Sequence, residues 1–231
     1  IATADAVTLL TNPPAETVAA DIKCTEQEVV PRGRLWRLSG GHYASSIKSA
    51  LGGSVDAAGA PLDGVADNKF STSSKQNVVS QPWADWYFAQ GDKVAGALAA
   101  ALPASHACMT AAGASPDCVQ AFVKDYAAKL FRRPVTADEL TRYQTAYTAW
   151  AADMGPADAT YALLQAWAMS PNHVFRTELG DRKPGKVDLT QFEIASEISF
   201  TFAGGAPDAA LLADAEQGKL SDPALVRGHA A

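Results

Sequence analysis

Charge, cysteine and long apolar runs are all scarce in this 231-residue sequence, and each scarcity argues against a class of protein. Charged residues make up 19% of the chain and hydrophobic residues 48%, a balance typical of a folded globular protein rather than a disordered one. The net charge of -6 argues against nucleic-acid binding, because phosphate contacts need clustered lysine and arginine. No apolar run approaches the roughly 20 residues of a membrane-spanning helix, so we predict no transmembrane segment.

The chain has only three cysteines. Cys108 and Cys118 bracket MTAAGASPD, a short stretch of small residues, glycine and proline that can bring two thiols together. Closing such a loop stabilises a fold by about 3 kcal/mol in the chain-entropy model. The alternative is three reduced thiols in the core, and from the residues alone both interpretations stay open. Cys24 is left without an evident partner, and no cysteine spacing suits zinc or c-type haem attachment.

Helical patterns dominate, and the clearest is DCVQAFVKDYAAKLF. Its large apolar residues recur at the i, i+3, i+4 spacing of a helix face that packs on a core. Ser115 is placed as the N-cap, with Pro116 in the first helical position. The predicted buried face consists of Val119, Phe122, Val123, Tyr126 and Leu130.

The segment LFRRPVTADELTRY places two arginines directly before a proline and a helix-start signal. Thr136 and Glu139 have the spacing of a capping box. Arg132 and Arg133 lie where positive charge complements a helix dipole and where a guanidinium fork suits a buried carboxylate. Pro134 cannot continue the first helix. We therefore predict a structural junction formed by these five residues, the alternative being a site for an external anion.

The helix that follows this capping box carries a hydrophobic staple, with Val135 outside the helix and Leu140 inside it. Its predicted buried face consists of Leu140, Tyr143, Tyr147, Trp150 and Met154.

A further helix is predicted in DATYALLQAWAMS, where Tyr161, Leu164 and Trp167 share one face and Pro171 ends the run. The basic loop RKPGK, residues 182–186, is the best candidate for an interior linker. A second capping box follows, from Thr190 to Glu193, and begins a helix. That helix is predicted to bury Ile194, Ile198 and Phe202, and two shorter helices are predicted after it, from Pro207 and from Ser221.

The first hundred residues are less regular. Helices are predicted over 42–51 and from about Ser80 to Ala101, with Gly91 a weak point of the second. Residues 53–74 are rich in glycine, aspartate and serine and predict mostly loop. Because no alternating strand pattern is present, the sequence predicts an all-α fold, an irregular multi-helix array with little or no β-sheet.

No residue set forces a catalytic activity. The four histidines belong to no HExxH motif or triad, and His173 and His42 are the candidates for cofactor contact, a structural role being the alternative. The stretch LDGVADN offers oxygen ligands for calcium but lacks EF-hand spacing, so we predict a polar loop and no metal site. Trp83, Trp86 and Tyr87 are candidates for stacking on a ligand such as a sugar, although their spacing is also that of a helix core.

Four stretches taken together resemble a known family. They are PRGRLWRLSGGHYASSIKSALGG, CVQAFVKDYAAKLFRRPVTADELTRY, LLQAWAMSPNHVFRTELG and DLTQFEIASEISFTFAGGAPDAALLADAEQGKLSDPALVRGHA. In this order they are similar to motifs of large exported proteins made of consecutive domains of unknown function, abundant in planctomycetes and myxobacteria. Those proteins are often fused to, or encoded with, planctomycete-type cytochrome c modules. One departure is Glu197, which stands where the family has an arginine.

The resemblance implies an exported protein, in the periplasm or at the cell surface, and this favours a disulfide between Cys108 and Cys118. It also implies four parts: an N-terminal extension (1–30), a first helical subdomain (31–103), a second with the disulfide loop (106–180), and the start of a third domain (187–231). Because family members continue further, we expect this last domain to be truncated and a C-terminal portion or another protein chain to be the partner.

The leading functional hypothesis is a helical scaffold and interaction module of an exported assembly in a redox, cytochrome-linked setting. No cofactor is expected on this chain, and haem is expected in a partner or in a further portion. One alternative is part of an exported oxidoreductase whose active site is completed by such a portion. A second alternative is a carbohydrate-binding module that uses the Trp83 cluster.

Overall fold

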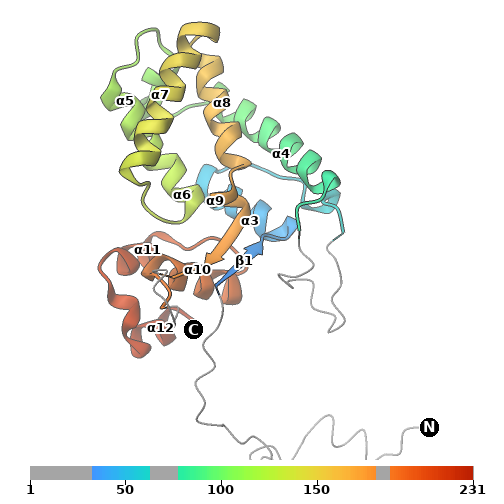
Figure 1. Cartoon of the computed structure of the whole chain (residues 1–231), viewed down its shortest axis with the longest axis vertical. Helices are drawn as coiled ribbons and strands as arrows, with labels where there is room; N and C mark the ends of the chain where they lie inside the picture. The colour runs from blue at the N-terminus through green and yellow to red at the C-terminus, as the bar shows by residue number, and fades with distance from the viewer. Residues whose placement is uncertain (1–32, 63–77, 181–187, 231) are drawn as a thin grey trace, which may run out of the picture. The chain divides into compact units, whose positions relative to one another are not determined.

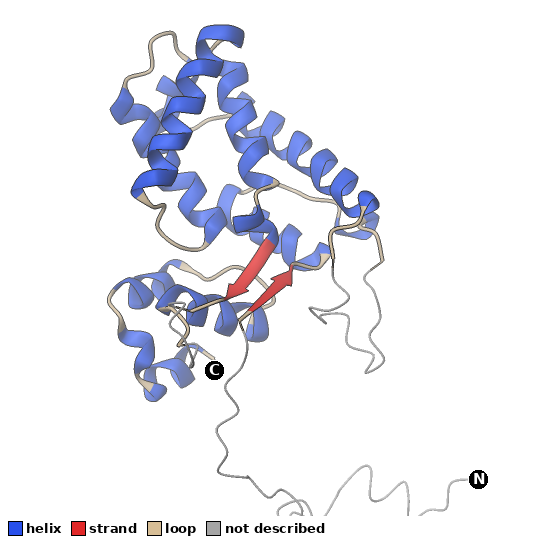
Figure 2. Ribbon diagram, in the orientation of Figure 1, coloured by secondary structure: helices blue, strands red, loops and turns tan. Residues whose placement is uncertain are grey.

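A computed structural model describes residues 33–62, 78–180 and 188–230, all within one compact unit, Arg32–Ala231 (Figure 1). The described part is mainly helical with one two-stranded sheet, which confirms the all-α prediction (Figure 2). Within these ranges no helix combines the length and apolar character needed to cross a membrane. The linker candidate 182–186 and most of the aspartate-rich stretch lie outside the described residues.

The α-helices and β-strands have the following order along the chain. They are β1 (Arg34–Arg37), α3 (Gly40–Leu51), α4 (Gln81–Ala100), α5 (Pro116–Phe122), α6 (Ala128–Phe131), α7 (Ala137–Met154), α8 (Pro156–Ala168), α9 (Pro171–Val174), β2 (Phe175–Glu178), α10 (Gln191–Phe202), α11 (Ala209–Glu216) and α12 (Pro223–His229). Short 3₁₀ turns occupy Ala57–Gly59 (η1), Ala104–Thr110 (η2) and Lys219–Ser221 (η4).

The predicted helix after Ser115 is present, but it is not a regular α-helix throughout. A π-helical turn, Val123–Ala127 (η3), connects α5 to α6. The predicted buried face is confirmed, and the wide turn adds Ala127 to it. Ser115 caps the start by accepting a hydrogen bond from the Cys118 backbone N–H.

A disulfide joins Cys108 in η2 to Cys118 in α5, with 6.4 Å between the two Cα atoms. It confirms the pairing that the family resemblance favoured over three reduced thiols. Closing this short loop stabilises the fold by about 3 kcal/mol in the chain-entropy model. It fixes the start of α5 beside the buried Met109 of η2.

Helix α8 packs against both α4 and α7 and lies between them (Figure 1). The sequence predicted a weak point at Gly91, but α4 runs through it without a break. A Cβ at Gly91 would lie 3.3 Å from Met169 Cγ and 3.5 Å from Ala168 Cβ. The glycine therefore lets α4 and α8 approach closely.

The sheet was not predicted from the sequence. Strands β1 and β2 pair antiparallel, with Arg34 opposite Glu178 and Arg37 opposite Phe175. Each strand has only four residues, too few to show an alternating pattern, and the two lie about 140 residues apart in the chain. Their pairing connects the start of the described chain to the end of the α5–α9 region.

Two hydrophobic clusters form the core of the described part. The larger cluster draws on α3 to α9 and includes Phe200 of α10, while the smaller cluster contains Ala195 and Ile198 of α10 together with residues of α11 and η4. The predicted burial of Phe202 is wrong, because the side chain is 64% exposed and Phe200 is the buried ring. Helix α10 is thus buried on two faces. The domain boundaries expected from the sequence stay a prediction.

The predicted burial of Met154 is also wrong, since its side chain is 44% exposed. It is the last residue of α7, next to Gly155, where the chain turns into α8. Tyr147, on the same predicted face, is buried as expected.

Candidate functional site

The junction LFRRPVTADELTRY has an unusual backbone at its centre. Arg132 ends α6 in the left-handed region, with φ 58° and ψ 27°, and it is the only non-glycine residue in the described ranges with positive φ. Left-handed backbone costs a residue with a Cβ about 1 kcal/mol or more. It turns the Arg132 side chain into the protein, where only 3% of the residue is exposed.

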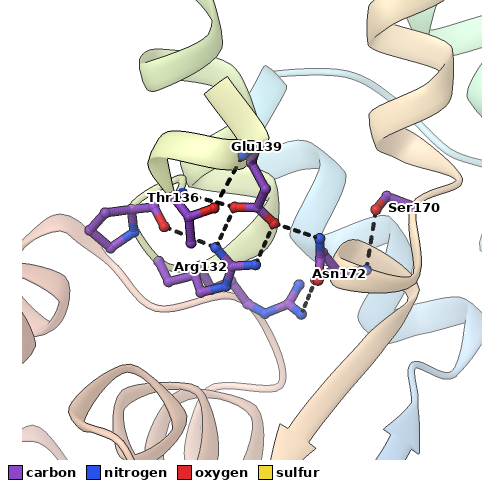
Figure 3. A network of polar contacts seen from close by, with 7 residues as sticks. Arg132, Thr136, Glu139, Ser170 and Asn172 are labelled. Atoms are coloured by element: carbon purple, nitrogen blue, oxygen red, sulfur yellow. Dashed lines mark hydrogen bonds and ion pairs between the residues drawn. The ribbon is translucent and has the colours of Figure 1, made fainter. Parts of the chain in front are cut away.

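The Arg132 guanidinium donates to four carbonyl oxygens from two segments of the chain. Nη1 bonds to Leu130 O at 2.9 Å and His173 O at 3.2 Å. Nη2 bonds to Asn172 O at 3.0 Å (Figure 3) and to Phe175 O at 2.8 Å. Burial, followed by the charges of neighbouring arginines, lowers the pKa of Arg132 to about 9, so the side chain still carries its proton at neutral pH.

Arg133 takes the other role that the sequence predicted for a guanidinium fork. Its Nη1 donates to Glu139 Oε2 and its Nη2 donates to Glu139 Oε1, both at 2.8 Å. Nη1 also donates to Pro134 O at 2.9 Å. Glu139 completes the predicted capping box by accepting from the Thr136 backbone N–H at 2.9 Å. These bonds, that of Arg133 first, lower the pKa of Glu139 to about 2.

Asn172 connects both arginines to α9. Its side-chain Nδ2 donates to Glu139 Oε1 at 3.1 Å, while its carbonyl accepts from Arg132 (Figure 3). Its backbone N–H donates to Ser170 Oγ, the N-cap of α9. The junction is therefore saturated by internal partners, as a structural junction requires.

His173, one of the two candidates for cofactor contact, lies fully buried directly after Asn172. Nδ1 is 2.9 Å from Ala168 O and Nε2 is 3.2 Å from Ser46 Oγ. Burial first, and then the charge of Arg132, lower the pKa of His173 to about 3, so the ring is neutral. Because a carbonyl only accepts, Nδ1 carries the hydrogen and Nε2 accepts from the serine. Both nitrogens are thus engaged within the protein.

His42, the other candidate, is half-buried on α3, and its ring meets the edge of Phe200 at 5.3 Å. Among the residues described, no group of three or more His, Cys, Asp or Glu side chains is placed to hold a metal ion. The structure therefore gives these two histidines separate surroundings, one in the core and one beside α10.

The three aromatic candidates for ligand stacking lie in the core. Trp83, Trp86 and Tyr87 are 3%, 7% and 3% exposed; Trp86 and Tyr87 pack against Tyr43, and Trp83 packs against these two rings. The Arg37 guanidinium covers the Trp83 ring at 3.7 Å. No ring face of this group is open for a ligand, in agreement with the core spacing of the sequence.

A charged group at the end of the sheet was not singled out from the sequence. Buried Glu178 of β2 lies 2.7 Å from Arg34 of β1 and 3.7 Å from Arg176. Arg176 also pairs with Glu197 of α10 at 3.2 Å. Burial first, and then Glu197, raise the pKa of Glu178. The available signal was Glu197, a carboxylate where the family that the chain resembles has an arginine.

The second capping box is present as predicted, and its glutamate also binds outside its own helix. Glu193 accepts from Thr190 N at 2.9 Å, from Leu179 N at 2.7 Å and from Gly180 N at 3.0 Å. A cavity of about 270 Å³ separates this box from the Arg132 junction, and its lining includes Phe175, Phe192 and Ser196.

A larger groove of about 510 Å³ opens on the other side of Arg133. One wall is the α5–α6 helix with Pro134 and Val135, and the other is α11. Its lining is mainly apolar, and the sequence gave no sign of it, because the two walls are about 80 residues apart in the chain.

Comparisons with known proteins match two adjoining segments. Residues 118–178 match the family model described as "PSD5: Protein of unknown function (DUF1595)", and residues 189–231 match the one described as "PSD4: Protein of unknown function (DUF1592)". No curated protein and no solved structure matches the chain. The chain therefore carries two consecutive domains of these kinds, which are associated with planctomycete cytochrome c modules.

Proposed function

We propose that the chain is a helical scaffold and interaction module, which holds consecutive domains of an exported assembly in fixed orientation within a cytochrome-linked redox setting. The observation that carries this proposal is the double burial of α10. This first helix of the second matched segment contributes Phe200 to the larger cluster and Ile198 to the smaller one. A helix shared by two cores resists rotation of one against the other.

Polar contacts between the two matched segments support the same role. Arg176 of β2 pairs with Glu197 of α10, and Glu193 holds the backbone of Leu179. Beyond the end of α10, Gly205 lies against Ser45 of α3, and a Cβ at this glycine would force the serine hydroxyl to move. The second matched segment is therefore tied to the first through α10, and the chain after α10 also lies against α3.

The proposal is tested first on the natural protein in its own cells. An affinity-tagged copy would be purified gently from the cell envelope, its mass measured, and its reduced-minus-oxidised spectrum recorded. We expect a multi-protein or multidomain assembly with haem absorption bands, while the 231-residue chain produced alone shows none. A monomer without haem-bearing material in the native preparation would overturn the proposal.

A matched pair of substitutions tests the role of α10 itself. Phe200→Ala removes a buried ring, and Phe202→Ala removes an exposed ring two residues away. We expect Phe200→Ala to accelerate amide hydrogen exchange in α10 and to destabilise the chain by about 3 kcal/mol, with Phe202→Ala close to neutral. Equal rates of amide hydrogen exchange in α10 of the two variants would contradict a helix that is shared by the two cores.

A further inference from the structure

We propose that the groove between the α5–α6 helix and α11 is the docking site for one amphipathic α-helix of a partner domain. The partner helix presents a stripe of small aliphatic side chains, with an acidic edge towards Lys124 and a basic edge towards Glu216. This proposal rests on the proposed function and specifies the partner of that module.

The groove has an apolar floor of mostly small residues. Its volume is about 510 Å³, enough for several side chains of a partner. The apolar members come from both matched segments and from the connection after Arg133; they are Ala128, Pro134, Val135, Phe192, Ala209, Leu212 and Ala213. Alanines on both walls let a third backbone approach closely, as helix packing requires.

The spacing of the lining residues favours a helix as the occupant. The α11 wall contributes Ala209, Leu212, Ala213 and Glu216, the i, i+3, i+4, i+7 row of one helix face. Such a row forms one side of a groove into which the ridge of another helix fits. A helix also satisfies its own backbone hydrogen bonds, which an apolar floor cannot do for an extended strand.

The α11 residues that face the groove are not needed to hold α11 in place. Its inner face consists of Leu211 and Ala215, which are 4% and 2% exposed in the smaller cluster. Leu212 lies one position along and is only half-buried. The helix therefore has a second apolar face that the described chain leaves partly uncovered.

The two walls differ in the charge that they leave available. Lys129 pairs with Asp125 at 2.6 Å, and Arg133 is held by Glu139. Lys124 and Glu216 line opposite walls, and neither has an ion-pair partner in the part of the chain that the structure describes. Opposite free charges on the two rims match a helix with one acidic and one basic edge.

Binding is tested with the full 231-residue chain and three fluorescent helical peptides. All three carry the same alanine and leucine stripe; one has a glutamate edge and a lysine edge, one has two glutamate edges, and one has two lysine edges. We expect the mixed-edge peptide to bind most tightly in fluorescence anisotropy. Equal binding of all three peptides, or of none, overturns the proposal.

Substitutions in the groove locate the binding. Leu212→Asp places a charge on the apolar floor and is expected to weaken the mixed-edge peptide more than about tenfold. Lys124→Glu, at an exposed position, is expected to weaken it about threefold, and Lys93→Glu on α4 is the matched control with no effect. If neither the Leu212→Asp variant nor the Lys124→Glu variant changes the affinity for the peptide, the peptide binds elsewhere and the proposal is overturned.

A double reversal separates charge matching from simple attraction. Lys124→Glu combined with Glu216→Lys exchanges the two rims, and the same peptide can bind in the opposite direction along the groove. We expect this double variant to regain most of the affinity that Lys124→Glu loses. Both positions are exposed, so the result does not depend on a variant that fails to fold. A further loss in the double variant overturns the assigned edges.

The native assembly distinguishes failure of this proposal from failure of the proposed function. If Leu212→Asp is folded and the haem-containing assembly persists unchanged, the scaffold role stands and the groove is not the docking site. If no such assembly exists with the unaltered chain, the proposed function itself fails. Loss of the assembly with Leu212→Asp but not with Lys93→Glu supports both.

Discussion

The two capping boxes of this chain have the same local geometry but hold different partners. Before α7, Thr136 and Glu139 exchange their two hydrogen bonds, and Glu139 also binds the Arg133 guanidinium and the Asn172 side chain. Before α10, Thr190 and Glu193 repeat the exchange, but Glu193 binds the backbone N–H groups of Leu179 and Gly180, which directly follow β2. The glutamate of the first box thus binds a charged side chain, and the glutamate of the second box binds backbone N–H groups.

The difference shows how one short segment is held from two sides. Residues 172–180 are bound near their start by Arg132 and Glu139 and at their end by Glu193. The capping box fixes where each helix begins, and the oxygen lone pairs left over on the glutamate attach that helix to a distant segment. The α9–β2 segment therefore connects the two matched regions.

The largest effect is expected at Arg132, which has no counterpart beside the second box. Arg132→Ala leaves four carbonyls without their donor and empties the buried volume of the side chain, and we expect the free energy of unfolding to fall by about 4 kcal/mol. Urea unfolding measures this, with Arg132→Lys as the intermediate case. A loss below about 1 kcal/mol would contradict the role of the guanidinium.

A direct comparison of the two boxes is expected to give the next largest effect. Glu139→Gln removes the charge that Arg133 needs, and we expect a loss of about 3 kcal/mol. Glu193→Gln keeps an acceptor oxygen for neutral backbone donors, and we expect a loss of about 1.5 kcal/mol. Added salt should shrink only the first loss, because Arg133 is 32% exposed. Identical salt responses would remove the distinction between the boxes.

Acid is expected to weaken the first box, because it protonates the Glu139 carboxylate. The pKa of Glu139 is about 2 in the folded chain against an ordinary 4.5, so its stabilisation is complete above pH 4.5 and is lost as the pH falls towards 2. We expect about 2 kcal/mol to disappear over this range. Glu178 acts in the opposite direction, because its raised pKa favours the protonated folded form at low pH.

The contribution of Glu139 is isolated by repeating the acid titration on Glu139→Gln. The difference in unfolding free energy between the two proteins should narrow as the pH falls from 5 to 2.5, while Glu178 affects both equally. A constant difference over this range would show that the Glu139 charge does not contribute.

The smallest effect is expected from the single bond that links the first box to α9. Asn172→Ala removes the hydrogen bond to Glu139 Oε1 but leaves the Asn172 carbonyl for Arg132. We expect a loss of about 1 kcal/mol in thermal unfolding. A loss as large as that of Glu139→Gln would mean that Asn172, not Arg133, orients the carboxylate.

Local signals predicted much of this fold. Both capping boxes, the N-cap at Ser115 and the helix faces around Phe122 and Tyr147 depend on neighbours in the sequence, and each is present in the structure. The all-α class followed from the same signals. What the sequence did not show depends on distant partners: the four-residue strands pair across the chain, and Phe200 rather than Phe202 meets the larger cluster.

The candidate site was predictable only in its residue types. An arginine pair before a proline indicated a junction, but left-handed backbone at a non-glycine residue has no sequence signature, and it is this conformation that turns Arg132 inward. Three of its four acceptors lie 40 or more residues away in the chain. Likewise His173 could not be assigned to the core until Ser46 and Ala168 were placed beside it.

The π-helical turn at Val123–Ala127 has a consequence for how sequences of this kind vary in length. A π turn accommodates one residue more than a regular helix, so the faces of the helix before and after it are preserved. Removing one residue here would restore a regular helix and still leave Phe122 and Leu130 facing inward. We expect homologous chains to gain or lose a single residue at this turn, and to conserve helix length on either side of it.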